Sequence, residues 1–312
     1  MDCRIYSSPA LQPKSIAYTV LCSLDEEVGS ISDAHRVALK IWEWMKQYLD
    51  VSPPVFTENE AIGTTHIIYR YRMSTDKHYL SLRVVTRNNH GEIAVATIPE
   101  ALAHKLDVEP ETYSPKKDFQ EYIAPRRELP PGQYVIPAPI IYRILGQPCI
   151  DCRETGIIIA GMVEKPLQIY PEDLDRYSLR TIVADLHCVT GWTVKNIAWT
   201  GVPLKYLLEE AGLREGAKYG LIYGLDGYSA VVPIPYLLDE NTLLATRMNH
   251  EPIPPEHGGP VRLVVPALYG WKSVKWVSRI LLLDRYLDGF WESLGYHERG
   301  SPWLEERFKS PL

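Results

Sequence analysis

The chain has few cysteines and no long apolar run. Five cysteines among 312 residues is an odd and sparse number, which does not indicate a small secreted domain held together by disulfides. No apolar run reaches the length of about 18 residues that a membrane-spanning helix needs. The N-terminal segment also has no basic stretch followed by an apolar core, so it does not read as a secretory signal. These absences predict a cytoplasmic protein with no membrane span.

The chain also has no excess of basic residues. Its 39 acidic residues outnumber its 33 basic ones, and the net charge is −6. This balance excludes a general nucleic-acid binder, which would carry a basic surface. An apolar content of 46% with 23% charged residues is typical of a globular protein long enough for two domains.

The first part of the chain predicts a small α+β domain over residues 1–110, whose role the sequence does not indicate. Residues 15–22 are rich in strand-forming side chains, and residues 65–73 and 78–86 predict two strands of a hairpin. Residues 32–51 show apolar side chains at helical spacing, with Ser32 or Asp33 as the expected N-cap.

A proline-rich segment without sustained periodicity follows and predicts a linker over residues 111–127. Beyond it, short apolar runs broken by glycine and proline alternate with one clear helix at 203–213. Residues 128–312 therefore predict a second α+β domain with mixed sheets.

Acidic residues are missing from one long window near the C-terminus. Residues 257–283 contain four basic side chains and no Asp or Glu. One interpretation is a pocket for an anion such as phosphate, in which Arg262 offers a planar set of donors. The other is a solvated strand face with scattered charges. The charge pattern alone leaves both open.

The stretch "DLHCVTGWT" places Cys188 beside His187 and raises a similar choice. A single cysteine in a strand-rich domain is more often buried and inert than functional. A catalytic thiol needs a base, yet neighbouring strand residues point to opposite faces. Cys149 and Cys152 form one CxxC pair, which could be a redox pair, a local disulfide or two ordinary thiols. A single thiolate still suffices for a soft, high-valent metal whose remaining ligands come from an organic cofactor.

Several longer stretches then match one family in order. They are "ADLHCVTGWTVKNIAWTGVPLKYLL", "DGYSAVVPI", "LLATRMNHEPIPPEHGGPVRLVVPALYGWKSVKWVSRI" and "GFWESLGYHERGSPW". Together they resemble the molybdopterin-binding domain of the sulfite oxidase family, and most closely its small stand-alone prokaryotic members. The resemblance covers about residues 128–308 and implies the same α+β fold for this part of the chain.

The resemblance also implies roles for individual residues. Cys188 matches the cysteine that ligates molybdenum in the family. Residues that match or flank the binding site for the pterin and its phosphate are His187, Asn249, His257, Arg262, Lys272, Ser273 and Lys275. Asn249 stands in the family's usual Asn-Gly pair, although here His250 replaces the glycine. Tyr228 and Trp192 are expected either as walls of the substrate pocket or as packing residues.

The implied activity is two-electron oxygen-atom transfer on a small-molecule substrate, either sulfite-like or an S- or N-oxide. It would depend on a molybdenum cofactor, with tungsten as a possible substitute and without haem, and on an external electron carrier protein or a quinone. The segment after Cys188 contains only Lys195 where sulfite oxidases carry arginines, which disfavours sulfite. Two alternatives are a non-catalytic carrier of the molybdopterin cofactor and a hydrolase that pairs Cys188 with His187 or His257.

Overall fold

The computed structural model divides into two compact units. It describes residues 1–7, 16–62, 65–106, 108–113, 128–142, 144–148 and 156–309. The first unit comprises Met1–Gln120, Phe290–His297 and Arg307–Leu312, and the second comprises Glu121–Gly289 and Glu298–Glu306. The sequence predicts that residues 128–312 form the second domain, whereas two C-terminal stretches belong to the first unit. Cys149, Cys152 and most of the expected linker lie outside the described residues.

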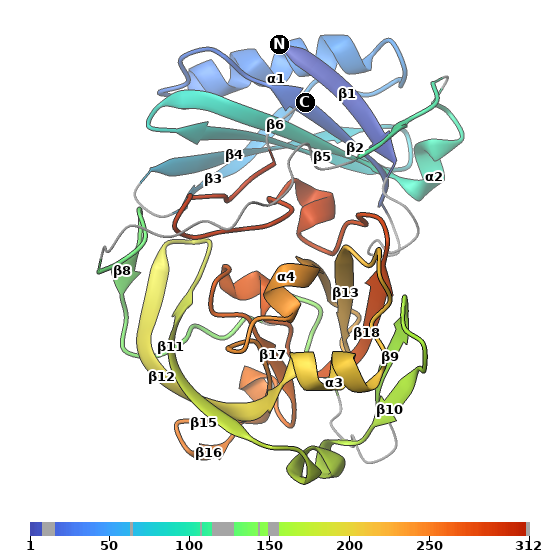
Figure 1. Ribbon diagram of the computed structural model, residues 1–312. Helices are drawn as coiled ribbons and strands as arrows, with labels where there is room; N and C mark the ends of the chain where they lie inside the picture. Colours follow the sequence, from blue (N-terminus) through green and yellow to red (C-terminus); the bar gives the residue numbers. More distant parts are fainter. Residues whose placement is uncertain are drawn as a thin grey trace. The chain divides into compact units, whose positions relative to one another are not determined.

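A seven-stranded sheet forms the centre of the first unit, in the order β3-β4-β5-β6-β2-β1-β7 (Figure 1). Its strands are β1 (Asp2–Ser7), β2 (Ile16–Ser23), β3 (Val55–Ile62), β4 (His66–Ser74), β5 (Tyr79–Arg87), β6 (His90–Pro99) and β7 (Glu111–Thr112). All neighbours are antiparallel except β1 and β7. The helices are α1 (Ile31–Met45) and α2 (Glu100–Ala103). The apolar side of α1 packs against one face of this sheet in a shared core.

Local sequence signals explain several of these elements. The expected hairpin is confirmed, because β4 and β5 pair in register from Ser74 with Tyr79 onward. The expected caps of the helix were wrong by two or three residues, since the N-cap is Ser30. Its hydroxyl accepts a hydrogen bond from the Asp33 backbone and donates one to the Asp33 carboxylate, which stabilises the first turn.

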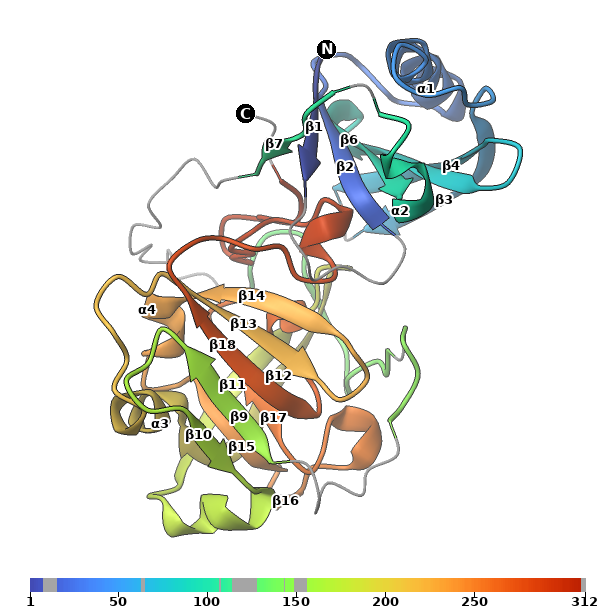
Figure 2. The same ribbon diagram turned by 90° about the vertical axis from the view of Figure 1, so that its right-hand side faces the viewer.

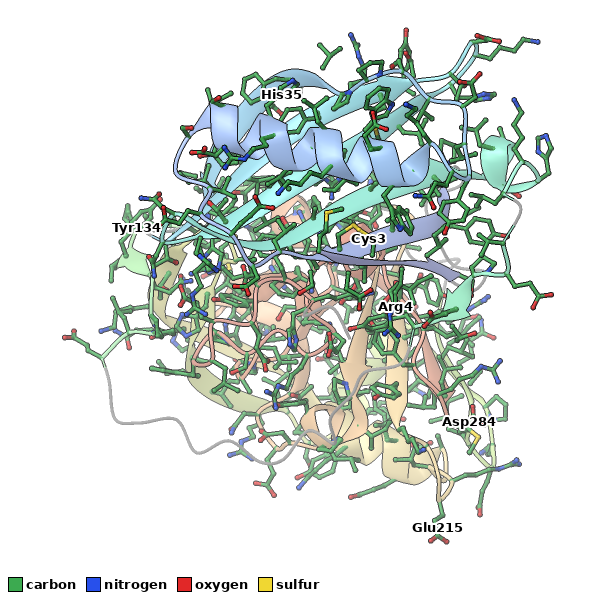
Figure 3. All side chains as sticks on the ribbon, turned by 90° about the horizontal axis from the view of Figure 1, so that it is seen from above. Cys3, Arg4, His35, Tyr134, Glu215 and Asp284 are labelled. Atoms are coloured by element: carbon green, nitrogen blue, oxygen red, sulfur yellow. A yellow bond between two sulfur atoms is a disulfide. The ribbon has the colours of Figure 1, made fainter. Side chains whose placement is uncertain are left out.

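A disulfide joins the first two strands. Cys3 and Cys22 lie directly opposite each other in the β1–β2 ladder and form the bond seen in Figure 3. The scarcity of cysteines argues against a disulfide scaffold, and in the described ranges this crosslink adds to a sheet that already has an apolar core.

The C-terminal stretches cover the other face of the same sheet. Because side chains alternate along a strand, Thr19, Arg83 and Val95 face away from α1. Thr19 donates to the Ser293 carbonyl at 2.8 Å, and Arg83 donates to the Leu294 carbonyl at 3.0 Å. Gly295 follows at φ +94°, where an added Cβ would lie 2.5 Å from Val95 Cγ2. The sheet is therefore completed by residues from both ends of the chain.

The second unit contains two sheets. One has the order β10-β9-β18-β13-β14, and the other has β11-β12-β15-β16 with β17 beside β15 (Figure 2) and β8 beside β12 (Figure 1). The strands are β8 (Tyr134–Val135), β9 (Ile157–Gly161), β10 (Leu167–Ile169), β11 (Arg180–His187), β12 (Trp192–Pro203), β13 (Tyr219–Gly224), β14 (Ser229–Pro233), β15 (Leu243–Met248), β16 (Glu251–Pro252), β17 (Arg262–Val264) and β18 (Val277–Leu283).

Short helices connect these strands. They are α3 (Leu204–Glu210), α4 (Ile234–Leu237) and the 3₁₀ turns η1 (Pro171–Arg176), η2 (Pro255–His257) and η3 (Gly270–Lys272), while η4 (Glu292–Leu294) belongs to the first unit. One apolar core joins side chains of both sheets and α3. Parallel pairs occur in each sheet among mostly antiparallel ones, so the expected α+β fold with mixed sheets is confirmed. No helix in the described part of the chain is long and apolar enough to cross a membrane.

The packing of Gly295 generates a prediction. Gly295→Ala should lower the free energy of unfolding by about 1–3 kcal/mol, because the methyl group meets Val95 and the backbone is left-handed. Urea denaturation followed by circular dichroism measures this change. Gly29→Ala is the matched control in the same unit, since its added Cβ would have no neighbour nearer than 3.8 Å. Equal stability of the two variants would contradict this account of the packing.

Candidate functional site

Cys188 begins a tight turn between β11 and β12. Its backbone N–H donates to the Trp192 carbonyl at 2.8 Å, and its carbonyl accepts from the Gly191 N–H at 3.0 Å. Gly191 has φ +104°, a conformation that glycine adopts without steric cost. The Thr-Gly sequence therefore closes the hairpin and fixes the cysteine at its first position.

The sulfur of Cys188 is half-buried and is not part of a disulfide. Thr190 Oγ1 donates a hydrogen bond to Sγ at 3.2 Å from within the same turn. The Tyr142 hydroxyl lies 3.4 Å from Thr190 Oγ1. Because Thr190 has a single hydroxyl hydrogen and gives it to sulfur, Tyr142 is the donor in this second contact.

A second chain of hydrogen bonds holds the backbone of Cys188. Gln133 Nε2 donates to the Cys188 carbonyl at 3.0 Å, and Gln133 Oε1 accepts from Thr193 Oγ1 at the same distance. Thr193 Oγ1 lies 2.9 Å from His187 Nδ1 and accepts its hydrogen. Sequence reasoning missed Gln133, although it stands in the stretch "LPPGQYVIP" at which the family resemblance begins.

His187 belongs to this scaffold and does not contact the thiol. Its ring is buried, packs edge-on against Trp303 with a centroid separation of 6.1 Å, and bonds to Thr193. Burial lowers its pKa to about 4, and Asp185 opposes this only in part. In the described part of the chain, no hydrogen bond joins Cys188 Sγ to His187 or His257. The hydrolase alternative therefore lacks the nucleophile–base contact that it requires.

Arg262 lies in β17 and is buried. Nη1 donates to the His257 carbonyl at 2.8 Å and Nη2 to the Ser273 carbonyl at 3.0 Å, while the guanidinium lies 5.2 Å from the Trp199 ring centroid. Burial lowers its pKa to about 10. Among the described residues no carboxylate pairs with it, and its Nε has no hydrogen-bond partner. This is a buried cation whose counter-charge the described chain does not provide.

The two lysines of the window differ in what their side chains contact. Lys272 is fully buried and donates to the carbonyls of Val231 and Glu298 at 2.7 and 2.6 Å, which ties η3 to its surroundings. Lys275 is closer to the cysteine turn, since its Nζ donates to the Tyr142 carbonyl at 2.6 Å. Ser273 is buried, and its hydroxyl accepts from the Val265 backbone at 3.0 Å.

His257 ends η2 beside two of these cations. Its pKa is lowered, first by burial and then by the charges of Arg262 and Lys275, while Glu256 acts in the opposite direction. Two cations and one carboxylate therefore act on His257 in addition to its burial. A pair of cations near one position is expected of a site for an anion.

Three expected site residues have structural contacts of their own. Trp192 is only 4% exposed and belongs to the apolar cluster against which Cys188 packs, and its Nε1 has no partner among the described residues. The Tyr228 hydroxyl donates to the Trp271 carbonyl at 2.6 Å. Asn249 Oδ1 accepts from the Ala198 backbone at 3.1 Å. Each residue thus supports the fold around the site.

The hairpin between β15 and β16 keeps the geometry of an Asn-Gly turn without the glycine. Asn249 has φ +53° and His250 φ +71°, and Met248 pairs with Glu251 across the turn. The left-handed conformation that glycine would adopt at little cost is therefore imposed on a histidine.

The cysteine turn and the basic window meet within the second unit. At Gly270 an added Cβ would lie 3.2 Å from Leu186 Cδ1 and 3.4 Å from the His187 carbonyl, so η3 closely approaches the end of β11. On the other side, Cys188 packs on the cluster that contains Trp199, over which Arg262 stacks. The two features that the sequence singled out separately thus belong to one region.

The residues of this region fit a molybdopterin cofactor. Its phosphate would supply the negative charge that buried Arg262 lacks, and Cys188 offers one soft thiolate for a metal. The buried donors Arg262 Nε and Trp192 Nε1 have no acceptor in the described chain, as expected beside a polar group that the protein itself does not supply.

Comparisons with known proteins define the class. A family model described as the oxidoreductase molybdopterin binding domain matches residues 145–291. The protein named "Uncharacterized oxidoreductase YuiH" of Bacillus subtilis is 39% identical over 158 residues, which are 51% of this chain and 80% of that protein. These findings define a molybdopterin-dependent oxidoreductase. The chain belongs to the sulfite oxidase family.

The names of two other relatives specify a substrate. This chain matches a smaller share of the length of each of them. The protein-methionine-sulfoxide reductase catalytic subunit MsrP of Campylobacter jejuni is 32% identical over 161 residues, covering 46% of this chain and 54% of that protein. The mitochondrial sulfite oxidase of Drosophila melanogaster is 34% identical over 112 residues, covering 33% of this chain and 20% of that protein. The chain thus spans about half or less of these two relatives.

The hairpin at Asn249 and His250 gives a test of stored strain. His250→Gly should raise the free energy of unfolding by about 0.5–1 kcal/mol, because glycine adopts the left-handed conformation more readily. Asn249→Gly should bring no such gain, since it also removes the Oδ1 acceptor of the Ala198 N–H. Chemical denaturation measures both, and a destabilised His250→Gly protein would show that the imidazole has a role of its own.

The cations beside His257 give a pH-dependent prediction. The pKa of His257 should lie below its ordinary value of 6.5, so its protonation destabilises the folded state as the pH falls below that value. Lys275→Met should raise this pKa by removing a neighbouring charge, and added inorganic phosphate should raise it in the wild-type protein. NMR titration of the imidazole measures it. Exposed Lys165→Met is the control, and an unchanged pKa in Lys275→Met would contradict the electrostatic account.

Proposed function

We propose that this oxidoreductase transfers an oxygen atom in a two-electron reaction on a small, uncharged S-oxide or N-oxide, and that Cys188 is the protein ligand of its molybdenum. The observation that supports this proposal most directly is the burial and hydrogen bonding of the Cys188 sulfur. It is half-buried, outside any disulfide, and accepts a hydrogen bond from Thr190 within the same turn, whereas the neighbouring His187 is bonded to Thr193. Such a thiolate is suited to one metal–sulfur bond.

The basic residues give the cofactor a second point of attachment. Arg262, His257 and Lys275 would hold the pterin phosphate, with Arg262 contributing a buried charge and Lys275 a charge nearer the turn. When bound, the cofactor supplies the two-electron oxygen-atom transfer chemistry. The protein binds it, orients it and excludes water around it. The two electrons would be exchanged with an external carrier, either a protein or a quinone.

The charges near the cysteine turn favour an uncharged substrate. Lys195 is the only basic residue in the segment that follows Cys188, and its Nζ pairs with Glu128 at 3.1 Å. A cation that already has a carboxylate partner attracts an anion weakly. The name of the MsrP relative, a reductase of methionine sulfoxide, is consistent with this class.

Substitution of the cysteine tests the proposal. Cys188→Ser should lower the reduction of methyl sulfoxides and amine N-oxides by a reduced dye at least about 100-fold, whereas its pterin content should stay near that of the wild-type protein because the phosphate site is intact. The double variant Cys149→Ser, Cys152→Ser is the control for a general loss of thiols. Turnover is measured by dye oxidation, and pterin by fluorescence after release.

Elemental analysis and a second substrate complete this experiment. Absence of molybdenum and tungsten from wild-type protein made in a cofactor-competent host would refute the metal site. Retained turnover in Cys188→Ser would refute the ligand role. Sulfite oxidation faster than S-oxide reduction would overturn the substrate class and leave the metal site standing.

A further inference from the structure

Two side chains outside the expected cofactor-binding set form a hydrogen-bond chain to the sulfur of Cys188. Thr190 Oγ1 donates to Sγ at 3.2 Å, and the Tyr142 hydroxyl lies 3.4 Å from the same oxygen. Neither residue was singled out from the sequence. Both acquire their position from the fold, because Thr190 is two residues along the turn from Cys188 and Tyr142 comes from the segment after β8.

Tyr142 is fixed at both of its ends although its side chain is exposed. Its carbonyl accepts from Lys275 Nζ at 2.6 Å, while its hydroxyl donates to Thr190. The β8 segment that precedes it is fastened to the cysteine turn, since the Tyr134 N–H donates to the Gly191 carbonyl at 2.8 Å and the Ile136 N–H to the Thr193 carbonyl at 2.9 Å. The ring of Tyr134 itself is 51% exposed and is labelled in Figure 3. Thr190 is therefore oriented by a partner that is itself anchored.

The direction of these hydrogen bonds has an electronic consequence. A donor on a thiolate sulfur withdraws electron density from it, so the sulfur donates less to a bound metal. When the sulfur donates less electron density, the metal is easier to reduce. Hydrogen bonds to ligand sulfurs have this effect on reduction potentials in other metal centres. A donor to Thr190 Oγ1 polarises its hydroxyl and strengthens the bond to sulfur.

We propose that Thr190, oriented by Tyr142, is a positioning residue that sets the electron donation of the Cys188 sulfur and so raises the reduction potential of the metal centre. This inference rests on the proposed ligand role of Cys188. The inference does not require Thr190 or Tyr142 to contact the substrate. It gives the turn sequence a second function besides closing the hairpin.

The experiment is a redox titration of the holoenzyme in which the one-electron reduced metal is followed by electron paramagnetic resonance. In Thr190→Val the midpoint potential should fall, with a tenfold change in the redox equilibrium corresponding to about 59 mV. Tyr142→Phe should lower it by a smaller amount, because the hydrogen bond to sulfur remains but loses its support. Thr190→Ser keeps the hydroxyl and should restore the wild-type potential. The absorption band for charge transfer from sulfur to metal should shift in the same order.

A second threonine pair on the same strands provides the matched control. The Oγ1 atoms of Thr181 and Thr200 lie 2.8 Å apart and share a hydrogen bond between β11 and β12, away from the turn. Thr200→Val removes a threonine hydroxyl from the same strand pair and should leave the potential unchanged. If Thr200→Val changed the midpoint potential as much as Thr190→Val does, the change would reflect a general loosening of the hairpin. That result would overturn the inference.

The outcomes separate this inference from the proposed function. A wild-type potential in both Thr190→Val and Tyr142→Phe, with normal metal content, overturns the inference and leaves the ligand role of Cys188 intact. Absence of metal from the wild-type protein overturns both. If Thr190→Val does not fold, the exposed Tyr142→Phe variant decides alone: a lowered potential supports the inference and an unchanged one refutes it.

Discussion

The turn from Cys188 to Gly191 is the constraint on which the site depends. Its backbone hydrogen bonds fix the length of the hairpin, and a glycine at φ +104° allows the chain to reverse. Only with that reversal can Thr190 reach the sulfur, and only with β8 paired to β12 can Gln133 reach the cysteine carbonyl. Backbone geometry, rather than a contact between large side chains, thus determines where the thiol lies.

The basic window serves the fold and the site together. Lys272 and two nitrogens of Arg262 donate to backbone carbonyls, most of which lie outside the regular strands, so these cations stabilise irregular segments. Among the described residues the Arg262 Nε–H has no partner, and the charges of Arg262 and Lys275 both act on His257. A bound anion would therefore meet a scaffold whose charged groups are already ordered, which reduces the entropic cost of binding.

Part of this arrangement could be predicted from the sequence, and part could not. Cys188 and the acid-free window stand out by residue type and spacing, and the β4–β5 hairpin follows from alternation of apolar side chains. β3 escaped notice because most of its side chains are exposed and it carries no apolar alternation. Thr190, Gln133 and Tyr142 were also missed, since threonine, glutamine and tyrosine are common in loops and only the three-dimensional turn brings them together around Cys188. Contacts between distant segments leave no periodic signal.

The construction of the first unit from both ends of the chain has a consequence for how the protein folds during synthesis. Thr19 and Ser293 meet across a sequence separation of 274 residues. A ribosome releases the N-terminal strands long before the segment that covers their second face has been made. Until then the sheet can form its core with α1 but must leave the other face in water. The first unit is thus completed only after the second unit has been synthesised, and in the interval its uncovered sheet face must be protected from aggregation.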